Sequence, residues 1–170
     1  EARSLTFAHR RKVFLVSTPT IRGLSRIERE FEASDQRRYF VPCPHCDAMQ
    51  WLKFERLRWE KGRPEAAEYL CEGCDTPIAE HHKTRMLERG EWRATATATD
   101  PTTVGYHLSA LYSPVGWLSW SRIARSWEAA QGSDEAIKAF RNTILGETWV
   151  ETGEAPDWQR LYDRREAWRP

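Results

Sequence analysis

Two cysteine pairs, Cys43-Pro-His-Cys46 and Cys71-Glu-Gly-Cys74, contain all four cysteines of the chain and determine how its middle folds. A CxxC pair brings two thiolates to one ion from a single tight turn, and two such turns supply the ligands of a tetrahedral zinc site. The interval between the pairs is slightly longer than the usual range of about 15–20 residues, which a loop insertion accommodates. Four protein ligands leave no position for water. The predicted site is therefore structural, and its metal contributes a folding free energy on the order of 10 kcal/mol.

Two disulfides or a redox-active cysteine pair are the alternatives to a zinc site. Both pairs have the same short spacing, and no thioredoxin-like βαβ pattern surrounds either, which disfavours the redox alternative. His45 could replace a cysteine as a ligand, although a residue at that place in the turn more often points outward. His81 and His82 are interpreted as a solvated helix start.

The composition leaves the partner open. The chain has 170 residues, enough for one ordinary domain or two small ones, and a net charge of +1, so a nucleic-acid surface would have to come from local clustering. No stretch approaches the roughly 18 apolar residues of a membrane span, and no signal peptide is present, so we expect a soluble protein. Zinc-held thiols suit a reducing cytoplasm. The chain begins without Met, at what looks like mid-helix, which suggests a piece of a longer protein.

The N-terminal part contains a short apolar run, Val13-Phe-Leu-Val16, without alternation. Such a run predicts a strand buried on both faces, as in the parallel sheet of an α/β domain. Pro19 would end the strand, so that the hydroxyls of Ser17 and Thr18 lie at its carboxyl end, where open α/β sheets bind ligands. A simple strand-ending turn is the other interpretation. Ser25-Arg-Ile-Glu28 then matches a capping box and predicts a helix that ends near Ala33.

The remaining pattern predicts short strands around the cysteine turns and helices after them. The strands are expected at 38–41, 49–54, 68–70 and 77–78, an arrangement typical of a zinc ribbon. A short helix is expected at 83–88, stopped by Gly90. Apolar residues at helical spacing predict two further helices, one from Trp120 to Gly132 and one capped by Ser133 and ended by Gly146.

The segment between the two cysteine pairs, here called the basic loop (residues 53–63), is the local candidate for a phosphate contact. Aromatic residues are interleaved with its basic ones, which suits a protein that tracks a nucleic-acid backbone. An ordinary solvated hairpin with its aromatics packed inward is the equally weighted alternative. The DNA-binding candidates are Lys53, Arg56, Arg58, Lys61 and Arg63.

The order of motifs resembles the large subunit of tailed-phage DNA-packaging terminases of the lambda type. The resemblance covers most of the chain, and the Ser-Asp-Gln-Arg-Arg run before the first cysteine pair is its most specific part. The matching segments are Lys12-Val-Phe-Leu-Val-Ser-Thr-Pro-Thr20, Ser25-Arg-Ile-Glu28, Ser34-Asp-Gln-Arg-Arg-Tyr-Phe-Val-Pro-Cys-Pro-His-Cys46, Gly90-Glu-Trp92, Gly105-Tyr-His-Leu-Ser-Ala-Leu-Tyr-Ser-Pro114 and Asn142-Thr-Ile-Leu-Gly-Glu-Thr-Trp149.

The resemblance implies a RecA-like packaging ATPase and an RNase H-like nuclease in the parent protein, which would use ATP and magnesium. It also implies that Ser17, Thr18 and Pro19 form the ATPase coupling motif and that the four cysteines belong to a zinc insertion between the two activities. The sequence contains no G-x-x-x-x-G-K-[ST] motif, no acidic Walker B strand before Ser17 and no clear set of nuclease carboxylates after Trp149. This chain alone should therefore hydrolyse neither ATP nor DNA.

The expected architecture is α+β: the edge of a RecA-like ATPase domain (1–37), an inserted zinc ribbon (38–80), a helical region packing on the ATPase domain (81–150) and a linker toward a nuclease domain (151–170). The resemblance implies double-stranded DNA, the terminase small subunit and the portal as partners, without a membrane, in the cytoplasm of an infected or lysogenic bacterial host. A free-standing zinc-ribbon nucleic-acid module and a purely structural docking element are the alternatives.

Overall fold

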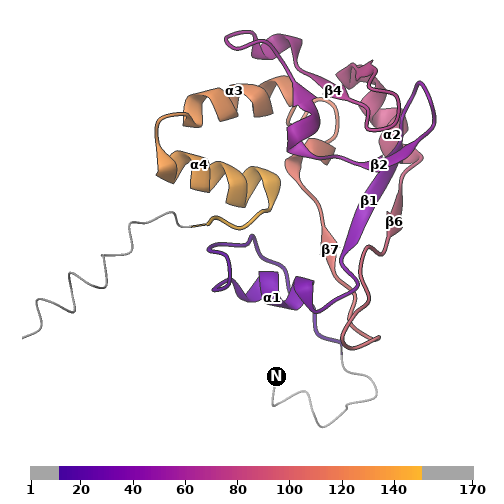
Figure 1. The fold of residues 1–170 in the computed structure, drawn as a ribbon, viewed down its shortest axis with the longest axis vertical. Helices are drawn as coiled ribbons and strands as arrows, with labels where there is room; N and C mark the ends of the chain where they lie inside the picture. The colour runs from indigo at the N-terminus through magenta and orange to yellow at the C-terminus, as the bar shows by residue number, and fades with distance from the viewer. Residues whose placement is uncertain (1–11, 151–170) are drawn as a thin grey trace, which may run out of the picture.

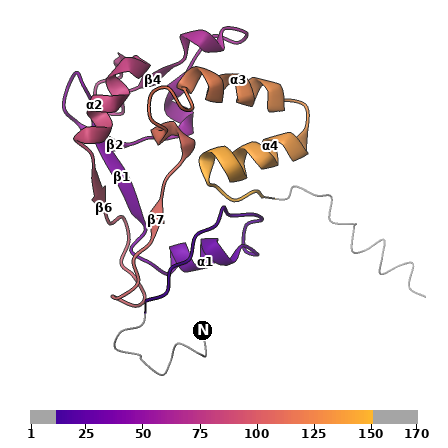
Figure 2. The ribbon, with the colours of Figure 1, turned by 180° about the vertical axis from the view of Figure 1, so that it is seen from behind.

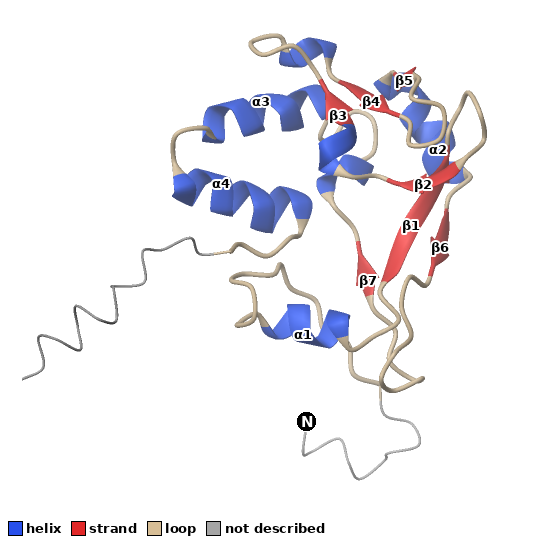
Figure 3. Ribbon diagram, viewed as in Figure 1, coloured by secondary structure: helices blue, strands red, loops and turns tan. Residues whose placement is uncertain are grey.

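The computed structural model describes residues 12–150, which form a mixed helix and sheet structure of α+β type (Figures 1 and 3). The helices are α1 (Arg26–Glu32), α2 (Lys83–Glu88), α3 (Trp120–Ala130) and α4 (Asp134–Phe140). The strands are β1 (Arg37–Pro42), β2 (Met49–Trp51), β3 (Leu57–Arg58), β4 (Glu68–Leu70), β5 (Pro77–Ile78), β6 (Glu91–Arg93) and β7 (Tyr106–His107). Short helical turns lie between them: η2 (Phe54–Arg56), η3 (Pro64–Ala66), η4 (Glu80–His82), η5 (Ala110–Tyr112) and the π-type η6 (Arg141–Leu145).

Two small sheets carry the cysteine pairs. In the first, β1 pairs antiparallel with β2 and β6 and parallel with β7, and the first cysteine pair forms the turn between β1 and β2. In the second, β4 pairs antiparallel with β3 and β5, and the second cysteine pair forms the turn between β4 and β5. Each cysteine pair therefore closes a β-hairpin, as the sequence predicts.

Serine side chains cap α3 and α4: the sequence predicts the cap at Ser133 but not the one at Ser119. Ser119 and Ser133 each accept a hydrogen bond from a backbone N–H in the first turn of α3 and α4. Gly146 ends η6 in the left-handed conformation, with a φ of 66°, which glycine adopts at little cost. The two helices pack against each other, and α3 also packs against η3. Helix α1 lies below α4 in both views (Figures 1 and 2).

One buried cluster extends from the hairpins into the helices. It includes Val41 and Tyr69 from the two sheets and Trp120, Ile123 and Phe140 from the helical part. The buried hydroxyl of Tyr112 is hydrogen-bonded to the first hairpin: it accepts from Leu52 N–H and donates to the Tyr39 carbonyl. The hairpins therefore share their core with the helices.

The strand expected at 13–16 is a wrong prediction for this structure. Residues 12–20 have no regular secondary structure, and the apolar side chains are exposed, Phe14 at 88% and Val16 at 77%. A strand that is apolar on both faces needs neighbours on both sides, and the described part of the chain supplies none for this run.

The capping box at the start of α1 is also wrong in its details. The helix begins after Ser25, but the Ser25 side chain makes no capping hydrogen bond. The carboxylate of Glu28 accepts the N–H of Gly23 at 2.7 Å and the hydroxyl of Thr148 at 2.8 Å. The hydrogen bond to Thr148 replaces the one that Glu28 would make in a capping box, and a local sequence motif cannot predict a partner so distant in the chain.

Candidate metal centre

The first cysteine turn is shaped by backbone hydrogen bonds around Cys43. Its N–H donates to the carbonyl of Ala48 at 2.9 Å, and its own carbonyl accepts from Asp47 N–H at 3.0 Å. Asp47 has a φ of 57°, which lets the chain reverse tightly. The N–H of His45 points at the Cys43 sulfur, 3.4 Å away, where it would stabilise a thiolate.

The second turn repeats the first almost bond for bond. Cys71 donates its N–H to the Thr76 carbonyl at 3.1 Å and accepts from Asp75, whose φ is 52°. The N–H of Gly73 lies 3.3 Å from the Cys71 sulfur. A side chain at Gly73 would place its Cβ 2.8 Å from that of Ala48 in the other turn, so glycine permits the close approach of the two turns.

The four sulfur atoms all lie within 4.8 Å of one another. Cys43 Sγ is 3.9 Å from Cys74 Sγ, and Cys46 Sγ is 3.8 Å from Cys71 Sγ. A zinc ion about 2.3 Å from each of four thiolates in a tetrahedron would space the sulfurs about 3.8 Å apart. All four cysteines are free, so the disulfide alternative is wrong, and the cluster has the size and donor set to hold one metal ion.

The two halves of the cluster differ in exposure. Cys43 and Cys71 are buried, whereas Cys46 and Cys74 are exposed. Burial raises the pKa of the Cys43 thiol to about 12. Without a cation this thiol would keep its proton at neutral pH, so metal binding would have to release a proton there.

Gln50 is a buried residue behind the cluster that the sequence did not single out. Its side-chain oxygen accepts from Glu72 N–H at 2.8 Å, and its side-chain nitrogen lies 3.6 Å from the Cys71 sulfur. The amide thus ties the β2 strand to the second turn and orients one ligand. An isolated Gln gives no signal in a single sequence.

Two residues of the basic loop support the second cysteine turn. Lys53 forms an ion pair of 2.7 Å with Glu72. Arg56 donates to the carbonyl of Cys71 and to the carboxylate of Asp75, the latter at 2.6 Å. Both cations are therefore already engaged in holding the turn that presents Cys71.

The other three basic candidates are exposed. Arg58 and Lys61 lie on the solvent side of the loop, while Arg63 pairs with Glu60 at 3.2 Å. Gly62 has a φ of 82°, and its N–H donates to Glu128 of α3 at 2.8 Å, which fixes the loop on the helix.

Two aromatic residues of the loop pack inward. The Phe54 ring lies 5.1 Å from that of Trp127 and 5.2 Å from that of Phe140. The Trp59 indole N–H donates to Glu128 at 3.0 Å. Since their rings face the helices, Phe54 and Trp59 present no open stacking platform.

The three histidines near the cluster lie beside it. His45 is exposed, and its ring centroid is 5.7 Å from that of His82, which in turn is 4.0 Å from that of His81. Among the described residues only the four cysteines converge as a possible metal site.

The expected coupling residues lie outside regular structure. Ser17 and Thr18 are exposed, and the Ser17 hydroxyl donates to the Thr18 carbonyl at 3.0 Å. The chain directly after them runs beside Trp149: Trp149 N–H donates to the Thr20 carbonyl and its carbonyl accepts from Arg22 N–H, both at 2.9 Å. The expected linker at 151–170 lies outside the described residues.

Comparison with known proteins gives two family matches along the chain. Residues 1–92 match the ATPase domain of the phage terminase large subunit gpA, and residues 103–170 match the endonuclease domain of the same subunit. No solved structure matches the chain, and no described helix has the length and apolarity needed to cross a membrane.

Two curated relatives are similar over most of the chain. The large terminase subunit of Enterobacteria phage P21 is 34% identical over 87% of the chain, and that of Escherichia phage lambda is 32% identical over 88%. The chain spans about a quarter of each relative's length, 26% and 27% respectively. The matches confirm the family indicated by the sequence motifs: the chain belongs to the gpA family of phage terminase large subunits.

Proposed function

We propose that this chain is the part of a DNA-packaging motor that joins ATP hydrolysis to DNA cutting. The family membership supports this role, because the ATPase and endonuclease matches follow each other along the chain. In this proposal residues 1–37 end a RecA-like ATPase domain, 38–80 are a zinc ribbon, 81–150 pack on the ATPase domain and 151–170 lead to the nuclease. ATP and magnesium act in other parts of the parent protein.

The observation that carries the proposal is the convergence of the four sulfurs. Cys43, Cys46, Cys71 and Cys74 would hold one zinc ion, whose closed coordination gives it a structural role. The metal would lock the two hairpins together and neutralise the thiolates in a partly buried place.

Metal content and folding test this role directly. We expect one zinc per chain and a loss of folded structure on chelation. Cys46→Ser should lose the metal, whereas the matched variant Cys46→His should keep it, because imidazole is also a zinc ligand. A folded, metal-free Cys46→Ser protein would overturn the structural-zinc proposal.

The coupling role has support in the pairing of Ile21 with Trp149. When the anion near Ser17, Thr18 and Pro19 is lost on ATP hydrolysis, the loop that follows them would shift and carry Trp149 with it. In the full-length subunit, Trp149→Ala should leave basal ATP hydrolysis intact and uncouple it from DNA packaging. Equal losses of both activities would contradict this role.

The exposed part of the basic loop is the proposed contact with double-stranded DNA; the small subunit and portal are further partners in the host cytoplasm. Arg58→Gln/Lys61→Gln should weaken duplex binding and lower its salt dependence. Arg29→Gln/Arg85→Gln removes the same charge from exposed positions on α1 and α2 and serves as the control. Equal binding by the two variants would remove the loop as a DNA contact.

A further inference from the structure

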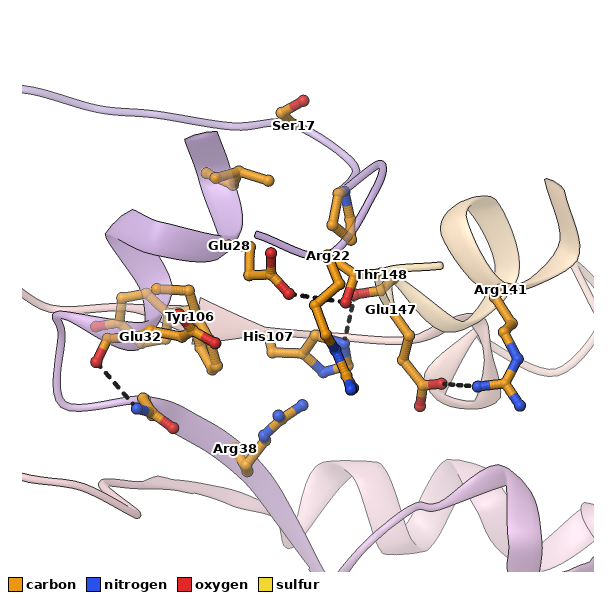
Figure 4. A pocket seen from close by; sticks show the side chains of 15 residues that line it. Ser17, Arg22, Glu28, Glu32, Arg38, Tyr106, His107, Arg141, Glu147 and Thr148 are labelled. Atoms are coloured by element: carbon orange, nitrogen blue, oxygen red, sulfur yellow. Dashed lines mark hydrogen bonds and ion pairs between the residues drawn. The ribbon is translucent and has the colours of Figure 1, made fainter. Parts of the chain in front are cut away.

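A second polar site lies apart from the cysteines, between the N-terminal segment, α1, β1 and the turn after η6. It is a pocket of about 410 Å³ (Figure 4). Three arginines and three glutamates contribute to its lining: Arg22, Arg38, Arg141, Glu28, Glu32 and Glu147. The formal charges of these six cancel, so what the pocket can bind depends on which of them are already paired.

Two of the arginines make no side-chain hydrogen bond or ion pair within the described residues, although the Glu147 carboxylate acts electrostatically on Arg38. Among the hydrogen bonds and ion pairs of residues 12–150, none involves the side chain of Arg22 or Arg38. The guanidinium of Arg38 lies over the Phe31 ring, with its Cζ 5.1 Å from the ring centroid. In Figure 4 the side chains of Arg22 and Arg38 both reach toward His107.

The nearby carboxylates are largely occupied. Both oxygens of Glu28 already accept hydrogen bonds, from Gly23 N–H and the Thr148 hydroxyl. Glu147 lies 3.7 Å from Arg141, and burial raises the pKa of Glu147, which weakens its negative charge. Glu32 is on the far side of the pocket, beside Tyr106 (Figure 4). The centre of the pocket is therefore rich in unused donors.

A smaller cavity of about 100 Å³ adjoins the same wall. Arg38, His107 and Glu147 line both spaces. The smaller one is also lined by Ser109, which is only 9% exposed and whose hydroxyl has no hydrogen-bond partner. A buried hydroxyl without a partner is uncommon and indicates a group that a ligand or water completes.

We propose that this pocket binds a phosphate group through Arg22 and Arg38. A guanidinium presents a planar fork of N–H donors that matches two phosphate oxygens. Arg38 is partly buried and so gains most from such a partner, whereas Arg22 approaches from the exposed rim of the pocket. The phosphate comes from a nucleotide or from the DNA backbone, which share this chemistry. The proposal is independent of the zinc site, because none of its residues contacts a cysteine.

Binding measurements on the 170-residue chain with zinc present test the pocket. The probes are inorganic phosphate, ATP without magnesium and a short DNA duplex. Their binding is measured by calorimetry and by changes in the NMR signals of the arginine Nε–H groups. Arg38→Gln should weaken the binding of whichever probe binds the unmodified chain, about 10- to 100-fold, because charged hydrogen bonds are lost. ATP binding tighter than phosphate identifies a nucleotide site; duplex binding that phosphate competes away identifies the DNA backbone.

The control variants distinguish specific binding in this pocket from nonspecific attraction of phosphate to positive charge. Arg125→Gln removes an exposed arginine on α3 and should leave binding unchanged, whereas Arg38→Lys should recover only part of the affinity because it loses the fork. If Arg38→Gln unfolds the chain, the Arg22 and Arg38 signals of the unmodified protein still report phosphate binding. Failure of all three probes to shift these signals, or equal binding by Arg38→Gln and Arg125→Gln, would overturn the proposal. One zinc per chain in the same sample keeps this result separate from the metal proposal.

Discussion

Replacing Glu80 with Met should destabilise the chain far more than replacing Lys83 with Met, although the two side chains form one ion pair. Lys83 Nζ lies 2.6 Å from Glu80 Oε1, and the lysine side chain is 0% exposed against 22% for the glutamate. The same Glu80 oxygen accepts the N–H of Trp120 at 3.0 Å. This carboxylate therefore joins the end of the second hairpin to the start of α3.

The magnitude follows from what each substitution leaves behind. Without Glu80, the contacts within residues 12–150 leave the buried ammonium only the Trp120 ring, 5.2 Å away, and the cost should be about 3–5 kcal/mol. Without Lys83, a partly exposed carboxylate still accepts from Trp120, and Met fills the space of the lysine stem, so about 1 kcal/mol should be lost. The double variant removes both charges and should cost about 2 kcal/mol, which gives a coupling energy of about 2–4 kcal/mol.

Urea unfolding of the zinc-loaded chain, followed by tryptophan fluorescence, measures all four proteins. The four m-values should agree, so that differences in midpoint report stability. The reasoning would be refuted if the two single substitutions cost the same and their sum matched the cost of the double variant within about 0.5 kcal/mol. Such a result would mean that the pair is not desolvated.

Three further predictions concern other parts of the molecule. Gly105→Ala places a Cβ against Ser34 Oγ and should cost about 1–3 kcal/mol in thermal unfolding, with partial recovery in the Ser34→Gly double variant. Burial lowers the pKa of His107 to about 4, so as the pH falls the unfolded state takes up a proton on this histidine before the folded state does. The free energy of unfolding should therefore fall by about 1–2 kcal/mol from about pH 7.5 to 5. His107→Gln should reduce this pH dependence in urea titrations. Gln50→Leu should weaken zinc affinity about 10- to 100-fold in a chelator competition without unfolding the chain, and unchanged affinity would exclude a role in orienting Cys71.

The cysteine turns were predictable because their information is local. A CxxC spacing specifies one tight turn, and the flanking β-forming residues specify the two hairpins that the structure contains. The cap at Ser133 and the stop at Gly146 depend on neighbouring residues in the same way, and both predictions are confirmed. The structure adds a cap at Ser119.

The wrong predictions concern residues whose partners are distant in sequence. Glu28 has the spacing of a capping box, yet one of its carboxylate oxygens accepts a hydrogen bond from Thr148, near the other end of the described chain. The Val13–Val16 run has the composition of a buried strand, but a strand also needs neighbours, which composition does not supply. Gln50 and Arg38 matter because of what surrounds them in space, which a single sequence does not encode.

The position of the cysteines within the core determines how widely a metal bound there would act. Cys43 and Cys71 belong to the same buried cluster as Trp120 and Phe140, so the sulfurs are part of the packing that holds the helices. A zinc ribbon with its own small core would melt alone when the metal is removed. The hairpins are also tied to α3, because Trp59 and Gly62 of the basic loop both donate to Glu128. Loss of a bound metal would therefore disturb packing that α3 shares. Metal removal should therefore loosen the hairpins and the helices in one transition.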